Sequence, residues 1–260
     1  YSILQRLNKE DTNIITVEDP IEMNIEGVNQ VQVNSEIGMT FAAALRSILR
    51  QDPNIILIGE IRDSETAQIA VRASITGHLV LSTVHTNNSL STIERMIDMD
   101  VERYLLSTAL SGIISQRLAR RICPYCATLR ETTPFEREVF KKVLKKDVPE
   151  VYQTGKCEHC ISGYHGRIAI QEVLLINDEI RDAISLEDVD KDELRTLVYG
   201  SNHVTTLLQD GLQKVLAGYT TFEEIYRLIE IENDLDEMAE VQKNLQKQKK
   251  ELEKSEKVSE

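Results

Sequence analysis

The chain of 260 residues has no tryptophan, and aromatic residues make up only 5% of it. No apolar run approaches the roughly 18 residues that a membrane-spanning helix needs, so a soluble chain is predicted. Basic residues are also in the minority, because 30 Lys and Arg stand against 43 Asp and Glu and give a formal net charge of -13. Nucleic-acid binders depend on attraction to phosphate backbones, so DNA or RNA is not expected as the main partner.

Cysteine is scarce, and its four copies fall into two Cys-x-x-Cys pairs, Cys123 with Cys126 and Cys157 with Cys160. No signal peptide precedes them, so this usage favours a cytoplasmic, reducing compartment and a bound metal over disulfides. Four thiolates on two tight turns can close a tetrahedral Zn²⁺ site that has no open position for catalysis. A structural Cys₄ zinc site is therefore predicted, with a redox pair as the alternative and His159 as an alternative ligand.

Three segments, 14–17, 55–58 and 79–84, have the composition of buried parallel strands, since they are continuous, apolar and rich in β-branched residues. Helical patterns lie between them, with Thr40 and Asp63 as expected N-caps. Strands that alternate with helices predict an α/β sheet.

We divide the chain into four predicted segments. Residues 1–122 form the α/β core, which starts with an amphipathic helix in mid-turn, as if cut from a longer protein, and ends in a helical region from residue 91 onward. Residues 123–160 form the cysteine module. A strand and two or three short helices are expected over 161–229, and a charged tail, helical or frayed, over 230–260.

Polar side chains follow the predicted strands at their carboxyl ends, where ligands of such sheets bind. Glu60 follows an apolar strand, which is the pattern of a Walker B strand whose acid holds Mg²⁺. The alternative is that Glu60 only makes this end of the strand soluble. Glu18 ends a neighbouring strand and could activate a water that attacks a γ-phosphate. His85 follows the third strand and is interpreted as a phosphate sensor. His78, at the other end of that strand, is either structural or responsive to phosphate.

These motifs resemble those of the motor ATPases of type II secretion and type IV pilus assembly. Residues 16–22 resemble the family's Asp box, 54–67 its Walker B segment and 76–87 its His box, and the two Cys pairs follow in the family's order. The likeness runs from residue 1 to about residue 229. Asn54 stands where family members often carry Asp, which is a small departure.

The resemblance implies a RecA-like P-loop ATPase core that binds ATP and Mg²⁺. In that fold Glu18 activates water, Glu60 serves Mg²⁺, and His85 and His78 respond to the γ-phosphate. Asp19 is a further candidate contact to the cofactor.

Arg62, next to the Walker B strand, is another candidate for a contact to the nucleotide or to a neighbouring subunit. A surface salt bridge is the alternative role for Arg62.

The sequence contains no Gly-x-x-x-x-Gly-Lys-[Ser/Thr] motif, so the backbone amides and the lysine that cradle phosphates are missing. The chain by itself is therefore not expected to hydrolyse ATP well, and the resemblance implies a phosphate-binding loop and arginine fingers upstream of it.

The resemblance also implies a hexameric ring at the cytoplasmic face of the inner membrane, acting on a membrane platform protein. The cysteine module favours the secretion and pilus-extension branches. Two alternatives stay open, a non-catalytic interaction module stapled by zinc and a nucleic-acid translocase with a related core.

Overall fold

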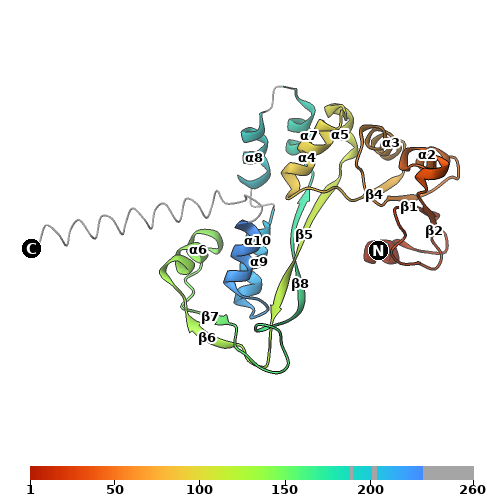
Figure 1. Ribbon diagram of the computed structural model, residues 1–260. Coiled ribbons are helices and arrows are strands. Elements are labelled where there is room, and N and C mark those ends of the chain that lie inside the picture. The colour runs from red at the N-terminus through yellow and green to blue at the C-terminus, as the bar shows by residue number, and fades with distance from the viewer. Residues whose placement is uncertain (188–189, 201–203, 231–260) are drawn as a thin grey trace, which may run out of the picture. The chain divides into compact units, whose positions relative to one another are not determined.

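The structure is a computed structural model that describes residues 1–187, 190–200 and 204–230 (Figure 1). The described residues form two compact units, one from residues 1–113, 174–187 and 190–200 and the other from residues 114–173 and 204–230. Among the described residues, no helix is both long enough and apolar enough to cross a membrane. Apart from residue 230, the predicted tail lies outside the described residues.

The first unit contains a four-stranded parallel sheet in the order β2-β1-β3-β4. Its strands are β1 (Ile14–Glu18), β2 (Asn29–Gln32), β3 (Ile55–Ile58) and β4 (Leu79–Ser82). This confirms the predicted α/β class. The prediction of a buried strand over 79–84 is wrong in part, because β4 ends at Ser82 and lies at the edge of the sheet with Leu79 46% exposed. Strand β2 was not predicted, because three of its four residues are polar and it presents no continuous apolar run.

Helices cover both faces of this sheet (Figure 1). On one face, α1 (Ser2–Leu7) buries Leu4 against Ile14 and Ile55. On the other face lie α2 (Phe41–Ile48) and α3 (Ser64–Ile75), whose N-caps are Thr40 and Asp63 as predicted. A short 3₁₀ turn, η1 (Ser35–Ile37), precedes α2, and the unit is completed by α4 (Ser89–Asp98), α5 (Arg103–Ala109), α7 (Asp178–Ser185) and α8 (Lys191–Gly200).

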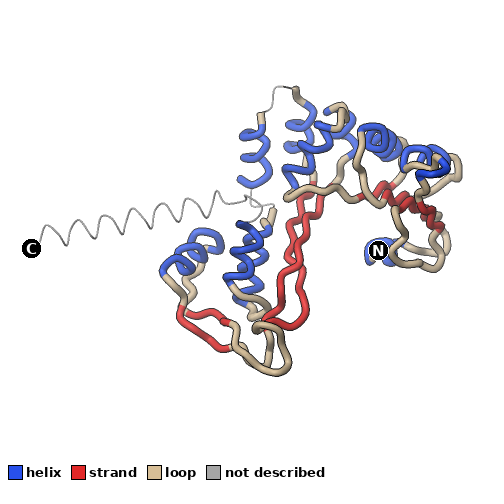
Figure 2. Tube along the Cα trace, in the orientation of Figure 1, coloured by secondary structure: helices blue, strands red, loops and turns tan. Residues whose placement is uncertain are grey.

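The prediction of a helical region up to residue 122 is wrong in its last part. Helix α5 ends at Ala109, and β5 (Gly112–Ile122) is an extended strand that pairs with β8 (Tyr164–Leu175). Figure 2 shows these two long strands side by side. At its start, exposure alternates along β5, since Ile113 and Ser115 are buried and Ile114 is exposed. A partner some fifty residues downstream therefore decides the conformation of this segment.

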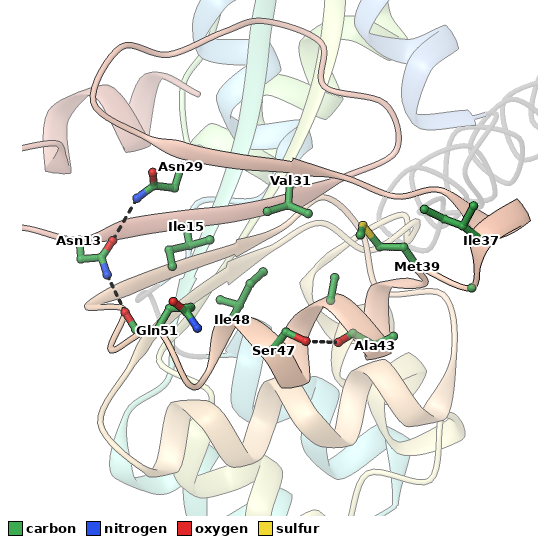
Figure 3. A pocket seen from close by; sticks show the side chains of 12 residues that line it. Asn13, Ile15, Asn29, Val31, Ile37, Met39, Ala43, Ser47, Ile48 and Gln51 are labelled. Carbon is green, nitrogen blue, oxygen red and sulfur yellow. Dashed lines mark hydrogen bonds between the residues drawn. The ribbon is translucent and has the colours of Figure 1, made fainter.

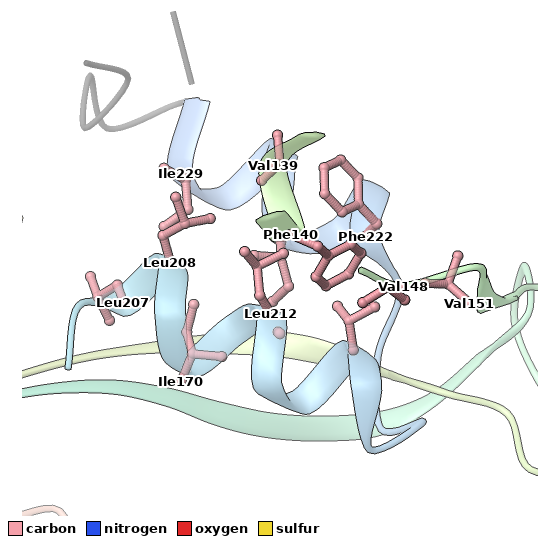
Figure 4. Close-up of a cluster of buried hydrophobic side chains, with 13 residues drawn as sticks. Val139, Phe140, Val148, Val151, Ile170, Leu207, Leu208, Leu212, Phe222 and Ile229 are labelled. Carbon is pink, nitrogen blue, oxygen red and sulfur yellow. The ribbon is translucent and has the colours of Figure 1, made fainter. Parts of the chain in front are cut away.

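The second unit packs helices around its own core (Figure 4). Its remaining elements are β6 (Thr128–Glu131), α6 (Pro134–Leu144), β7 (Glu150–Gln153), α9 (Leu207–Leu216) and α10 (Phe222–Glu230). Phe140, Leu212 and Ile225 are fully buried at the centre of this core. Gly211 allows α9 and α10 to pack closely, because a Cβ there would lie 2.7 Å from the Ile225 side chain.

Candidate functional site

The carboxyl ends of β1 and β3 are tied together by their backbones. The Gly59 N–H donates to the Val17 carbonyl over 2.7 Å. A Cβ at position 59 would lie 3.3 Å from both that carbonyl oxygen and the Glu18 Cα, which is tighter than most contacts of this kind. Glycine therefore lets the segment that carries Glu60 run close beside the segment that carries Glu18.

Glu60 lies between two basic side chains at this edge of the sheet. One carboxylate oxygen lies 3.1 Å from His85 Nε2, and the other accepts from the Arg62 guanidinium. Glu60 is 13% exposed, whereas the His85 side chain is 86% exposed. The hydrogen bond from Arg62, against a smaller opposing effect of burial, holds the pKa of Glu60 below its ordinary range. An ionised, partly exposed carboxylate is the kind of oxygen ligand that Mg²⁺ accepts.

Glu18 occupies a different environment at the neighbouring strand end. It is buried, and its carboxylate accepts three hydrogen bonds from neutral groups. The Tyr1 hydroxyl donates to Oε2, while the Thr16 hydroxyl and the Gln30 amide donate to Oε1 over 2.5 and 2.9 Å. In the described part of the chain, no hydrogen bond joins Glu18 to Glu60 or His85. The structure thus brings Glu60, His85 and Arg62 into contact and sets Glu18 on the adjacent strand.

The other two candidate residues lie in different places. Asp19 is exposed directly after β1, and its charge is a minor contribution, after that of Glu60, to the raised pKa of Arg62. His78 lies just before β4, at the opposite end of that strand from His85, and its Nδ1 is 2.9 Å from the Ala73 carbonyl oxygen. The structure does not bring His78 to Glu60, and its response to phosphate stays a prediction.

Three residues around Glu18 were not predicted to belong to this site. Thr16 could have been found, because residues two apart in a strand share one face of the sheet. Gln30 could not, since it reaches Glu18 through β2, which the sequence pattern did not reveal. Tyr1, the N-cap residue of α1, reaches Glu18 through its hydroxyl.

The four cysteines form the second candidate site. Their sulfur atoms all lie within 4.8 Å of one another, and they are the one group of potential metal ligands found among the described residues. The Cys123–Cys157 and Cys126–Cys160 sulfurs are each 3.7 Å apart, and the Cys157–Cys160 sulfurs are 3.6 Å apart. Tetrahedral zinc with bonds of about 2.3 Å requires sulfurs about 3.8 Å apart, whereas a disulfide requires about 2.0 Å. The donor set therefore fits zinc.

Local backbone geometry places these thiols. Cys123 follows β5 directly, and its N–H donates to the Gly163 carbonyl over 2.9 Å. Gly155 leaves room for the turn of the first pair, because a Cβ there would lie 2.0 Å from the Cys126 carbonyl oxygen. His159 lies outside the sulfur cluster and packs its ring against Tyr125, with ring centroids 4.7 Å apart.

A pocket of about 700 Å³ lies between β1, β2 and α2 (Figure 3). Apolar side chains including Ile15, Val31 and Met39 line it, and the amides of Asn13 and Asn29 lie at one end. Strand side chains alternate between faces, so Ile15 points to the opposite face from Glu18. The pocket contains none of the predicted site residues.

Comparison with known proteins places the chain among secretion and pilus proteins. A family model described as type II/IV secretion system protein matches residues 1–227. Over 229 residues the chain is 50% identical to the type II secretion system protein E of Dickeya dadantii, covering 88% of this chain and 45% of that protein. Over 234 residues it is 45% identical to the type IV pilus assembly ATPase PilB of Thermus thermophilus, and the match covers 86% of this chain and 25% of that protein.

Among solved structures, the chain resembles the pilus retraction motor PilT in a crystal structure with bound ADP. The TM-score is 0.61 at 30% identity, over 87% of this chain and 55% of that one. The chain spans about half the length, or less, of the relatives it matches.

Proposed function

Because this chain belongs to the type II/IV secretion system protein family, we propose that the full-length protein is an ATP-hydrolysing motor subunit that powers type II secretion or type IV pilus assembly. The observation that carries the proposal is the contact of Glu60 with Arg62 and His85 beside the strand end that bears Glu18. Relatives with the names of secretion and pilus ATPases support it.

In this proposal the two carboxylates have different tasks. Glu60 holds Mg²⁺, which when bound neutralises charge on the phosphates. Glu18 orients and deprotonates the attacking water. His85, exposed and in contact with Glu60, responds to the γ-phosphate. Arg62 pairs with Glu60 and would exchange that partner for a phosphate oxygen when nucleotide binds.

The phosphate-binding loop is proposed to lie outside these 260 residues, which contain no such motif. The isolated chain should then be inactive. We also propose that the full-length subunit works as a hexameric ring on a platform protein at the cytoplasmic face of the inner membrane.

The cysteine cluster is proposed to hold one structural Zn²⁺ through Cys123, Cys126, Cys157 and Cys160. Zinc would tie the end of β5 to the segment that precedes β8. Its four sulfur ligands would leave it without a direct role in hydrolysis.

Steady-state ATP hydrolysis by the full-length protein tests the motor proposal. Glu60→Gln and Glu18→Gln should each lower kcat by about 100-fold or more, because they remove the Mg²⁺ ligand and the base. Glu65→Gln is the matched control, since Glu65 is exposed near the same sheet and pairs with Arg46 at the surface. It should leave kcat within about twofold. A full-length protein that does not hydrolyse ATP would refute the motor and leave the zinc-stapled interaction module. Near-normal rates in both carboxylate variants would instead refute the roles proposed for Glu18 and Glu60.

A further inference from the structure

Gln30 connects three parts of the first unit at Glu18. It lies on β2, opposite Thr16 in the parallel register. Its Nε2 donates to Glu18 Oε1 over 2.9 Å and to the Met23 carbonyl over 3.1 Å. Its Oε1 accepts from the Ile25 N–H over 2.7 Å. Gln30 thus links β2, the end of β1 and the loop between these strands.

The contact with Ile25 fixes which way the Gln30 amide points. A backbone N–H can only donate, so the amide oxygen of Gln30 must face Ile25. The NH₂ group is then directed at Glu18 and Met23, both of which present acceptors. The hydrogen-bond network itself assigns the oxygen and nitrogen of this amide.

The donors around Glu18 hold the plane of its carboxylate. Oε1 is held by Gln30 and Thr16, and Oε2 by the Tyr1 hydroxyl. A glutamate side chain otherwise has several rotatable bonds, and a base acts efficiently only when it is correctly oriented toward the proton it removes.

We propose that Gln30 is a positioning residue of the hydrolytic site, which sets the orientation of the Glu18 carboxylate through its side-chain amide. The inference rests on the proposed role of Glu18 as the base. Gln30 acts through Glu18, so its replacement should affect the chemical step and leave nucleotide binding intact.

Gln32 provides a matched control two residues along the same strand. It lies on the same face of β2 as Gln30. Its Oε1 accepts from the Ile21 N–H over 3.3 Å, so it also supports the loop after β1. In the described structure it makes no hydrogen bond to Glu18. If kcat falls only because β2 or this loop is disturbed, it should therefore fall in variants of both glutamines.

The test compares Gln30→Glu with Gln32→Met in the full-length protein. The control adds no charge, because position 32 lies opposite Glu18 in the register of β1 and β2. A glutamate at position 30 keeps an oxygen for the Ile25 N–H, which preserves that contact with the loop, but it replaces the donor to Glu18 with a second carboxylate. For Gln30→Glu, kcat should fall about tenfold or more at pH 7, with KM for ATP within about twofold. The acidic limb of the pH–rate profile should move up by about one pH unit, because two adjacent carboxylates resist joint ionisation.

Gln32→Met removes the contact with the Ile21 N–H without adding a charge, and it should change neither kcat by more than about twofold nor the pH profile. In a Glu18→Gln background, Gln30→Glu should have no further effect on kcat, because Gln30 acts through Glu18. If thermal unfolding shows that Gln30→Glu does not fold, Gln30→Asn takes its place. It keeps an amide but is too short to reach Glu18, and should lower kcat without changing KM.

Equal losses in the Gln30 and Gln32 variants, or an unchanged kcat and pH profile in Gln30→Glu, would overturn the positioning role alone. Normal hydrolysis by Glu18→Gln would instead overturn the proposed role of Glu18.

Discussion

At the scale of single residues, the two carboxylates at the edge of the sheet have unlike surroundings. Glu60 is paired with a guanidinium and an imidazole, whereas Glu18 is buried among the neutral donors Tyr1, Thr16 and Gln30. Two acids in unlike environments can perform different tasks in one reaction. This difference supports a metal-binding role for the first and a proton-accepting role for the second.

The cysteine cluster leads to a prediction of metal content. The purified protein should contain about one zinc per chain, measured by mass spectrometry of the released metal. Cys157→Ser should lose most of that zinc, because one of four converging sulfurs is removed. The loss should be accompanied by partial unfolding, since the binding of structural zinc is coupled to folding.

His159→Ala is the control for this experiment. His159 lies between Cys157 and Cys160 in sequence but packs against Tyr125 outside the sulfur cluster. The variant should keep its zinc. Loss of zinc from His159→Ala would show that the imidazole is a ligand, and iron or no metal in freshly reduced protein would contradict the Cys₄ zinc site.

At the scale of elements, Glu224 on α10 binds Arg120 on β5 through hydrogen bonds and an ion pair. Its carboxylate, 1% exposed, accepts from the Arg120 backbone N–H over 3.0 Å and from the Arg120 guanidinium over 2.6 and 2.9 Å. Arg227 adds a bond of 3.0 Å, and the Arg120 guanidinium also lies 4.0 Å from the centroid of the Tyr164 ring. The network joins a strand to a helix about a hundred residues later in the chain.

Glu224→Gln should lower the free energy of unfolding of the second unit by about 2 kcal/mol, because a buried acceptor of charged donors becomes neutral. Denaturant unfolding followed by circular dichroism measures the change. The neighbouring Glu223→Gln is the control, since Glu223 is 59% exposed and its pair with Arg130 should contribute less than about 1 kcal/mol. Equal effects of the two variants would contradict the role of burial.

The same network predicts how stability depends on pH. Burial tends to raise the pKa of Glu224, but the bonds from Arg120 and Arg227 outweigh it and hold the pKa below the ordinary value of 4.5. A carboxyl group whose pKa is lower in the folded than in the unfolded state stabilises the fold at pH values above its unfolded-state pKa. This stabilisation is lost as the pH falls through its folded-state pKa. The difference in free energy of unfolding between wild type and Glu224→Gln should be constant above pH 4.5 and should become smaller below it. A difference independent of pH would exclude this linkage.

At the scale of the whole molecule, all four cysteines belong to the second unit and none to the first. Removal of zinc by a chelator should therefore speed amide hydrogen exchange around residues 123–126 and 157–160 and in the strands that they join. Exchange in the sheet of the first unit should not change. Exchange measured by mass spectrometry before and after chelation tests this, and a uniform increase over both units would contradict it.

The sequence alone determined the features that depend on local pattern. Continuous apolar runs predicted β1 and β3, because buried parallel strands need apolar residues on both faces. The same pattern located β4 but wrongly predicted it to be buried. Thr40 and Asp63 were predicted as N-caps because their side-chain oxygens can satisfy free N–H groups at a helix start. The secretion and pilus family predicted from the motifs is confirmed.

Only the tertiary structure decided the features whose partners are distant in sequence. Segment 112–122 is a strand because it pairs with β8 some fifty residues downstream, although its local pattern had indicated a helix. The polar strand β2 exists through its pairing with β1, and that pairing brings Gln30 to Glu18. Hydrogen-bond partners and burial, rather than local propensity, fixed these conformations, so the surroundings of Glu18 could not be predicted from its neighbours along the chain.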